Sequence, residues 1–327
     1  MKTRNVGILF LVYAILLLTV LPAAAGVQYG TFVKVTEKAA GSFDEVSKAV
    51  ESGLQKAGWE ILGTYDTGVP QGCNFRSRVI IFSSKDYADA IMKNGVKSAF
   101  ALPLRAGVYE DETGINIAFV NPASINRTII DETKLDNFSS VVAESLIDVI
   151  AGAVPGTVVK KQIGEIRSKG RVSGMGGGDF VDKIKEVYTA KDDTTDTFKK
   201  ISEGVREGIH SNAKGWKLTY EYDLSDNGAI IFGVTNNKME RRAFTIAGEK
   251  RSSGSYKCPG IDHGASFPIE VVVYKDGDAV KVVTLDGMYR MKMYFEDAGM
   301  WAFMKNMTMP GEIEDEIVEM SISKLNK

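Results

Sequence analysis

The sequence has few of the residues on which catalytic and metal sites usually depend. Its 327 residues include only 2 cysteines and 2 histidines, and the formal net charge at pH 7 is −2. A chain without an excess of positive charge is not expected to bind nucleic acid, which requires clustered cations to displace counterions from phosphates. No Gly-x-Ser-x-Gly motif is present, so the sequence gives no indication of α/β-hydrolase chemistry.

With so few cysteines, the chain can form at most one internal disulfide. Cys73 precedes an apparent strand in the first half, whereas Cys258 follows the corresponding strand in the second half. A bridge between them would therefore join the two halves. The sequence alone leaves open whether they pair, because it does not show whether their Cα atoms lie within bonding range.

The N-terminus has the three-part layout of a secretory signal. Lys2 and Arg4 precede an uncharged apolar run over residues 6–21, and small residues follow it at 23–26. This pattern predicts a signal peptide over 1–25 and an exported protein, either extracellular, periplasmic or on the outer face of the cytoplasmic membrane. The alternative is an uncleaved anchor with membrane association, since the run is close to the minimum length that spans a bilayer.

Two stretches of the chain repeat one pattern. Residues 100–122 read FALPLRAGVYEDETGINIAFVNP, and residues 265–287 read ASFPIEVVVYKDGDAVKVVTLDG. When Pro103 is placed on Pro268, both strands and the turn stay in register without an insertion. Apolar residues occupy alternate positions of the first strand in both copies, which predicts a β-hairpin with one face on a core.

An apolar helical stripe precedes each hairpin at a similar distance. The stripes are Phe43, Val46, Val50 and Leu54 in the first half and Phe198, Ile201, Val205 and Ile209 in the second. A Gly-Trp pair follows each stripe, at 58–59 and at 215–216, and a second helical stripe follows each hairpin. The segregation of helices around an antiparallel hairpin predicts an α+β fold with two similar domains, each an antiparallel sheet with helices packed on one face.

These patterns divide the chain into regions. We expect a first repeat domain over residues 27–155, a glycine-rich and basic linker over 156–178, and a second repeat domain over 179–327. The linker ends in SGMGGG. This run superficially resembles a phosphate-binding loop, but it lacks the following Gly-Lys-Ser/Thr, so a flexible connection is the favoured interpretation.

The helix stripe, the Gly-Trp pair and the hairpin that closes in Asn121-Pro122 resemble the domain-of-unknown-function 302 family. In the first half the resemblance covers about residues 29–150 and includes ALPLRAGVYED. In the second it covers about 179–327 and keeps FPIEVVVYKD, but Asp286 and Gly287 replace the expected Asn-Pro. The resemblance implies a small helix-backed sheet, often in exported or membrane-associated proteins, with no established activity and no functional residues.

The methionines are concentrated in one segment of the second half, residues 288–309, where aromatic residues are interleaved with them. This segment is longer than its counterpart after the first hairpin. Core packing is one interpretation, because Met is a common gap filler. A ligand surface formed by Met300, Trp301, Met304 and Met307 is the second. The third is a Cu(I) site formed by Met300, Met304 and Met307, or a metal site that includes Cys258 and His263.

The sequence therefore favours an exported binding or accessory module over an enzyme. It assigns no catalytic residue and no cofactor. The expected partner is a small apolar ligand or another protein, and extracytoplasmic copper handling through residues 288–309 is the alternative. Neither the ligand nor the oligomeric state can be inferred from the residues alone.

Overall fold

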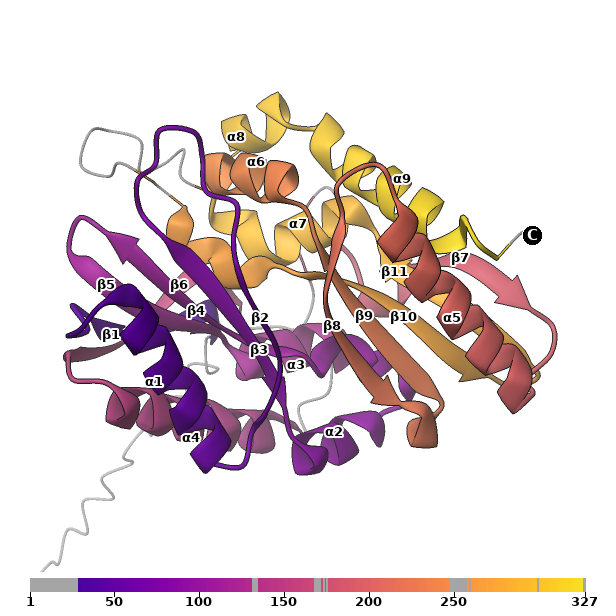
Figure 1. Cartoon of the computed structure of the whole chain (residues 1–327), viewed down its shortest axis with the longest axis horizontal. Helices are drawn as coiled ribbons and strands as arrows, with labels where there is room; N and C mark the ends of the chain where they lie inside the picture. The colour runs from indigo at the N-terminus through magenta and orange to yellow at the C-terminus, as the bar shows by residue number, and fades with distance from the viewer. Residues whose placement is uncertain are drawn as a thin grey trace, which may run out of the picture.

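The computed structural model describes residues 29–325 except 131–134, 168–171, 173, 175, 248–257, 259 and 299. The expected signal peptide lies outside this range. The described part of the chain forms two antiparallel sheets, with strand orders β2-β3-β4-β5-β1-β6 and β7-β11-β10-β9-β8 (Figure 1). The strands of the first sheet are β1 (Tyr29–Glu37), β2 (Glu60–Asp66), β3 (Ser77–Ser83), β4 (Leu104–Asp111), β5 (Gly114–Val120) and β6 (Thr157–Arg167). Those of the second are β7 (Ile184–Ala190), β8 (Lys217–Leu224), β9 (Ala229–Thr235), β10 (Ile269–Asp276) and β11 (Ala279–Leu285).

The first half has the helices α1 (Phe43–Lys56), α2 (Lys85–Met92), η1 (Val96–Ala101), α3 (Pro122–Ile130) and α4 (Asp136–Ala153). The second half has η3 (Phe180–Lys183), α5 (Thr195–Ser211), η4 (Ser225–Asn227), α6 (Asn237–Ala247), η6 (Ile261–Ser266), α7 (Gly287–Phe295), η7 (Glu296–Ala298), α8 (Met300–Lys305) and α9 (Thr308–Ile322). The helices α1, α2, η1, α3 and α4 of the first half correspond in order to α5, α6, η6, α7 and α9 of the second, which has η3, η4, η7 and α8 in addition. No helix of the described residues is long and apolar enough to span a bilayer.

The two sheets share one topology, as the repeated sequence predicts. β7 to β11 occupy the positions of β1 to β5, so both predicted hairpins form and both lie inside their sheets. Tyr109 pairs with Asn116 in the first hairpin, and Tyr274 pairs with Lys281 at the corresponding point of the second. The glycine before each tryptophan, Gly58 before Trp59 and Gly215 before Trp216, has a left-handed φ, which lets the chain leave the helix and enter the next strand. The fold is therefore α+β with two similar domains.

Each sheet is covered by its own helices on one face and by the other domain on the other face. α1 and α4 lie along the first sheet, and α5 and α9 lie along the second (Figure 1). The apolar side of β4, Leu104, Ala106 and Val108, is buried in the core with α1. Its other side is buried too, because η6 of the second domain packs across it. The two domains consequently share one continuous hydrophobic core, which the sequence did not predict.

A buried ion pair joins equivalent positions of the two domains. Arg105 pairs with Ile81 in the first sheet, and Glu270 pairs with Gly233 at the same point of the second. The Nη1 atom of Arg105 lies 3.1 Å from the Oε1 atom of Glu270, and both side chains are almost fully buried. Arg105 also donates to the carbonyl oxygens of Ser266 and Pro268. The two sheets therefore face each other around these two positions.

The first domain has one strand more than the second. Residues 157–167 of the expected linker form β6, which pairs with β1 along its whole length. The segment carries Val158, Val159 and Ile163, which suit a strand, and the free edge beside β1 supplies its hydrogen-bond partners. This differs from the expected flexible connection, and it extends the first domain to Arg167.

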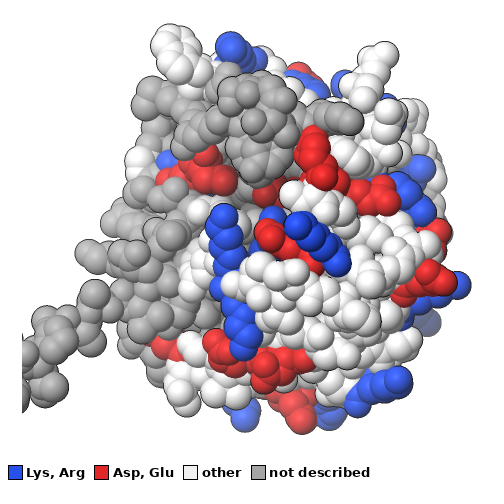
Figure 2. Space-filling model, turned by 90° about the vertical axis from the view of Figure 1, so that its left-hand side faces the viewer, with Lys and Arg blue, Asp and Glu red and all other residues white. Residues whose placement is uncertain are grey.

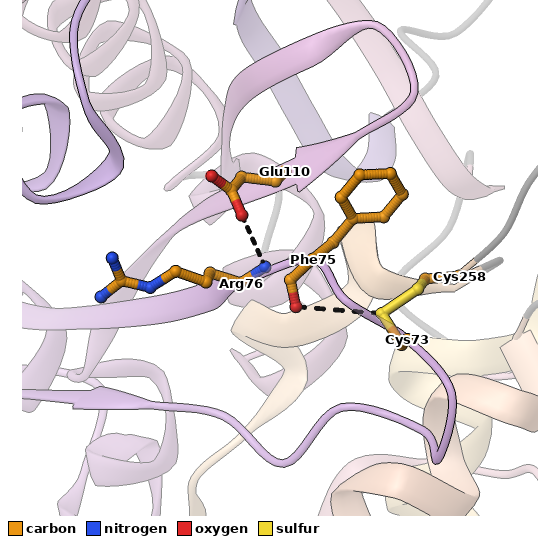
Figure 3. The surroundings of a disulfide bond; sticks show 5 residues. All are labelled: Cys73, Phe75, Arg76, Glu110 and Cys258. Atoms are coloured by element: carbon orange, nitrogen blue, oxygen red, sulfur yellow. Dashed lines mark hydrogen bonds between the residues drawn. A yellow bond between two sulfur atoms is a disulfide. The ribbon is translucent and has the colours of Figure 1, made fainter.

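The two cysteines form a disulfide between the domains. Cys73 lies in the loop between β2 and β3, Cys258 lies directly before η6, and their Cα atoms are 5.5 Å apart (Figure 3). The same loop is fixed on its other side, where the backbone N–H of Arg76 donates to Glu110 at the end of β4. The bridge therefore ties the start of η6 to the first domain.

Candidate functional site

A pocket of about 340 Å³ lies between the two domains beside this disulfide. One wall comes from β1, the end of β4 and β6 of the first domain. The other comes from the segment before η6, from η6 itself and from η7 of the second domain. The charged residues of the lining are Lys34, Asp111, Lys161, Asp262, His263 and Asp297. The pocket is therefore mainly polar, in contrast to the apolar cleft expected from the sequence.

His263 is the buried centre of the second-domain wall. Its Nδ1 lies 2.8 Å from Asp262 and its Nε2 lies 3.1 Å from Asp297, while the ring packs against Phe32 and Phe295. Burial by itself would lower the pKa of the imidazole, but the charges and hydrogen bonds of the two carboxylates outweigh it and raise this pKa to about 9. At neutral pH the side chain is therefore an imidazolium that donates from both nitrogens.

The opposite wall carries two lysines on neighbouring strands. Lys34 of β1 and Lys161 of β6 are direct cross-strand partners, and both line the pocket. The ammonium of Lys34 lies 3.0 Å from Glu37 and 5.8 Å from the ring centroid of Tyr109, and its side chain is only 15% exposed. Lys161 is exposed at the pocket wall. Positive charge thus gathers on the β1–β6 side of the pocket.

The elements that differ between the two domains meet at this pocket. β6 has no counterpart in the second sheet. η7 belongs to the connection 296–307 between α7 and α9, whereas only residues 131–135 connect α3 and α4. The turn glycines Gly95 and Gly260 precede η1 and η6 with similar φ, so His263 occupies the position that Ser98 holds in the first domain. Three departures from the shared fold therefore line one cavity.

The metal site that includes Cys258 and His263 is not supported. Cys258 is bonded to Cys73, so it has no thiolate to offer a metal. Both nitrogens of His263 lie against carboxylates, and its raised pKa keeps both protonated, so neither has a free lone pair. Among the described residues, no group of three or more His, Cys, Asp and Glu side chains is placed to hold a metal ion. These two residues do meet at one site, but as parts of the pocket lining.

The methionine-rich segment divides into a buried part and an exposed part. Met291, Met293 and Met309 are buried in the core, as the packing interpretation predicts. Trp301, Met304 and Met307 are exposed by 70%, 51% and 53% on and just after α8. Met300 begins the same helix. Trp301, Met304 and Met307 are not among the described residues that line the pocket beside His263, so these three candidates lie apart from Cys258 and His263.

Sequence reasoning missed Lys34, Lys161 and Asp297. A single signal pointed to the last of these, because Asp297 lies in the segment that is longer in the second half. The sequence pattern places Lys161 in the expected linker over 156–178, and no motif surrounds Lys34. Their proximity depends on the pairing of β6 with β1 and on the packing of η7 against β6.

Comparison with known proteins identifies the first domain. Residues 33–153 match the family model described as domain of unknown function DUF302. A solved structure, the uncharacterized conserved protein DUF302 from Bacillus stearothermophilus, is 13% identical to this chain, and the match covers 37% of this chain and 95% of that one with a TM-score of 0.31. No curated protein matches the chain. Residues 33–153 of the first domain therefore resemble the DUF302 family, a domain of unknown function.

Proposed function

We propose that this chain is an exported, non-catalytic binding protein that holds a small polar ligand in the pocket between its two domains. The observation that carries the proposal is the convergence of β6, η7 and His263 on one cavity. Each of these three features is present in only one domain, so the fold that the two domains share does not require them. Features that depart from the shared fold and meet at one cavity are better explained by a ligand than by stability.

The electrostatics of the pocket support binding rather than acid–base catalysis. A general base needs an unprotonated nitrogen near neutral pH, and the pKa of His263 is raised to about 9 by Asp262 and Asp297 against the opposing effect of burial. Its imidazolium instead fixes two carboxylates at the pocket wall. Asp262 and Asp297 are thus held at the pocket wall by a protonated His263.

Two observations support export. The N-terminal sequence has the layout of a signal peptide, and the disulfide between Cys73 and Cys258 is of a kind that persists in oxidising compartments. The proposal also includes a tandem repeat of the DUF302 domain, because the second sheet has the strand order of the first. The exposed patch of Trp301, Met304 and Met307 is the surface that suits a protein partner, but the ligand site does not depend on it.

Native mass spectrometry of protein purified from its own host tests the proposal. We expect a small-molecule adduct that is released on denaturation. Ile163→Trp should abolish it, because Ile163 lines the pocket and the larger side chain would occupy it. Val158→Trp is the matched control on the same strand, at an exposed position outside the pocket. A wild-type chain without an adduct, or an adduct that Ile163→Trp retains, would contradict the proposal.

One face of the molecule carries charges of both signs. Figure 2 shows the face at the left of Figure 1, where described Lys and Arg residues are interspersed with Asp and Glu. A surface of this kind does not concentrate one sign of charge, as a nucleic-acid groove would. This supports a small ligand over a polyanion.

A further inference from the structure

We infer that the ligand of this pocket carries an anionic group at one end, held by Lys34 and Lys161, and hydrogen-bond donors at the other end, held by Asp262 and Asp297. The inference rests on the proposed binding function and names its ligand class. Amino acids and short peptides have this chemistry through their carboxylate and ammonium groups. Sugar acids and sugar phosphates have it through their acidic group and hydroxyls.

The first argument is the unfavourable placement of the two lysines. Like charges directly opposite each other on neighbouring strands are destabilising, and Lys34 and Lys161 are direct partners on β1 and β6. In the described part of the chain, no carboxylate lies within ion-pair distance of Lys161. Lys160, one residue earlier, lies 3.8 Å from Asp148 of α4 and does not line the pocket. Lys34 has Glu37 as an ion-pair partner at 3.0 Å, so the ammonium of Lys161 is a second positive charge at the pocket wall, and its position there indicates a use in binding.

The second argument is the opposite sign of the facing wall. Asp262 and Asp297 both contact His263 and both line the pocket, so this wall presents carboxylate oxygens, which accept hydrogen bonds. The two carboxylate side chains are 11% and 26% exposed, respectively. A ligand that spans the pocket therefore meets the ammonium groups of Lys34 and Lys161 on the first-domain wall, which also includes Asp111 at the end of β4, and the carboxylates of Asp262 and Asp297 on the η6–η7 wall.

The third argument is size. The volume of about 340 Å³ is at the lower end of the range found for small-molecule sites. A flexible polymer or a large lipid would not be enclosed by it. The pocket suits a compact molecule whose two ends have different charge, and its two walls would orient such a molecule in one direction.

Calorimetry on the full mature chain tests the ligand class. The probes are alanyl-alanine, its C-terminal amide, its N-acetyl derivative, gluconate, glucose 6-phosphate and inorganic phosphate. We expect the free dipeptide to bind more tightly than its amide and its N-acetyl derivative, or gluconate or glucose 6-phosphate to bind more tightly than inorganic phosphate. Lys161→Gln should weaken that binding about tenfold, the loss of one charge-assisted contact, and Lys160→Gln should leave it within about twofold. Comparison of the dipeptide probes with the sugar probes distinguishes a peptide-like ligand from a sugar-like one.

The ligand-free protein gives a second readout that does not require the natural ligand. Lys161→Gln should raise the Tm by about 1–3 °C, because it removes the like-charge pair, whereas Lys160→Gln should leave the Tm unchanged or lower it slightly. A lower Tm for Lys161→Gln would make Lys161 a structural residue and overturn the inference. If the dipeptide binds and its amide binds equally well, the inference is also overturned. If native mass spectrometry shows an adduct but no probe binds, this inference fails and the proposed binding function stands.

Discussion

The disulfide between Cys73 and Cys258 should supply a large part of the stability of this protein. The cysteines are 185 residues apart in sequence, so the bond closes a loop that includes most of both domains. In the chain-entropy model, a closed loop of this length restricts the unfolded chain by about 5 kcal/mol. That is comparable to the whole stability of many domains, about 5–15 kcal/mol.

Replacing both cysteines by alanine is the appropriate perturbation. Cys258 is 4% exposed and packs in a small apolar cluster with Tyr109, Ala118 and Ile261, where a serine hydroxyl would lack a partner. We expect the free energy of unfolding, measured by urea titration, to fall by about 3–5 kcal/mol. The m-value should rise, because the unfolded chain without the cross-link exposes more surface.

Reductant provides the control for this experiment. Wild-type protein in reductant should show the same loss as the double variant, and reductant should have no effect on the variant itself. A loss below about 1 kcal/mol would refute the reasoning. It would mean that residual structure already restricts the unfolded chain without the cross-link, or that the cross-link is unfavourable in the folded state. A variant that reductant still destabilises would refute it as well.

Three further predictions concern the domain interface and the pocket. Glu270→Met should lower the free energy of unfolding by about 3–5 kcal/mol, because it leaves the buried cations Arg105 and Arg290 without their carboxylate. Arg105→Met should cost less, because Arg290 still lies 3.9 Å from Glu270, and the double variant should lose less than the sum in a urea double-mutant cycle. Gly233→Ala should destabilise by about 1–3 kcal/mol, because its added Cβ would lie 1.8 Å from the ring of Tyr220, and a smaller residue at 220 should reduce that loss. The pKa of His263 is raised from 6.5 to about 9 in the folded protein, so its protonation should contribute on the order of 3 kcal/mol to the free energy of unfolding. This contribution should be complete below pH 6.5 and lost between pH 6.5 and 9. His263→Gln should remove the corresponding pH dependence of the free energy of unfolding in urea titrations.

The part of the fold that depends on local pattern was predictable from the sequence. Buried residues at helical spacing, such as Phe43, Val46, Val50 and Leu54, placed α1 correctly. Its capping box at Ser42 and Glu45 is present in the structure. The repeated hairpin gave two similar domains, because register, turn and flanking helices agreed in both halves.

The contacts between the domains were not predictable in the same way. Alternation along β4 identifies Leu104, Ala106 and Val108 as core residues, but it reads Arg105 and Tyr109 as solvent-facing. Both are buried because a second domain covers that face, and no local pattern reports this cover. The candidate site depends on such contacts throughout, since His263 meets a carboxylate 34 residues further along the chain.

The interface also shows why two linked domains achieve what two identical subunits could not. In a two-fold symmetric pair, a residue on the axis faces its own copy. Arg105 and Glu270 occupy equivalent positions and contact each other, so two copies of the first domain in this arrangement would place arginine against arginine.

The neighbouring strands extend this argument. Gly63 and Tyr220 are equivalent, since they pair with Ile81 and Gly233 respectively, and a Cβ at Gly63 would lie 2.3 Å from the backbone of Thr219. The Tyr220 ring packs directly over Gly233. Where the first domain has Gly63 and Arg105, the second has Tyr220 and Glu270, and this complementarity requires two different sequences in one chain. Because the two domains differ in sequence, β6 can be present in the first domain alone and His263 and η7 in the second alone, and these three features line the same pocket.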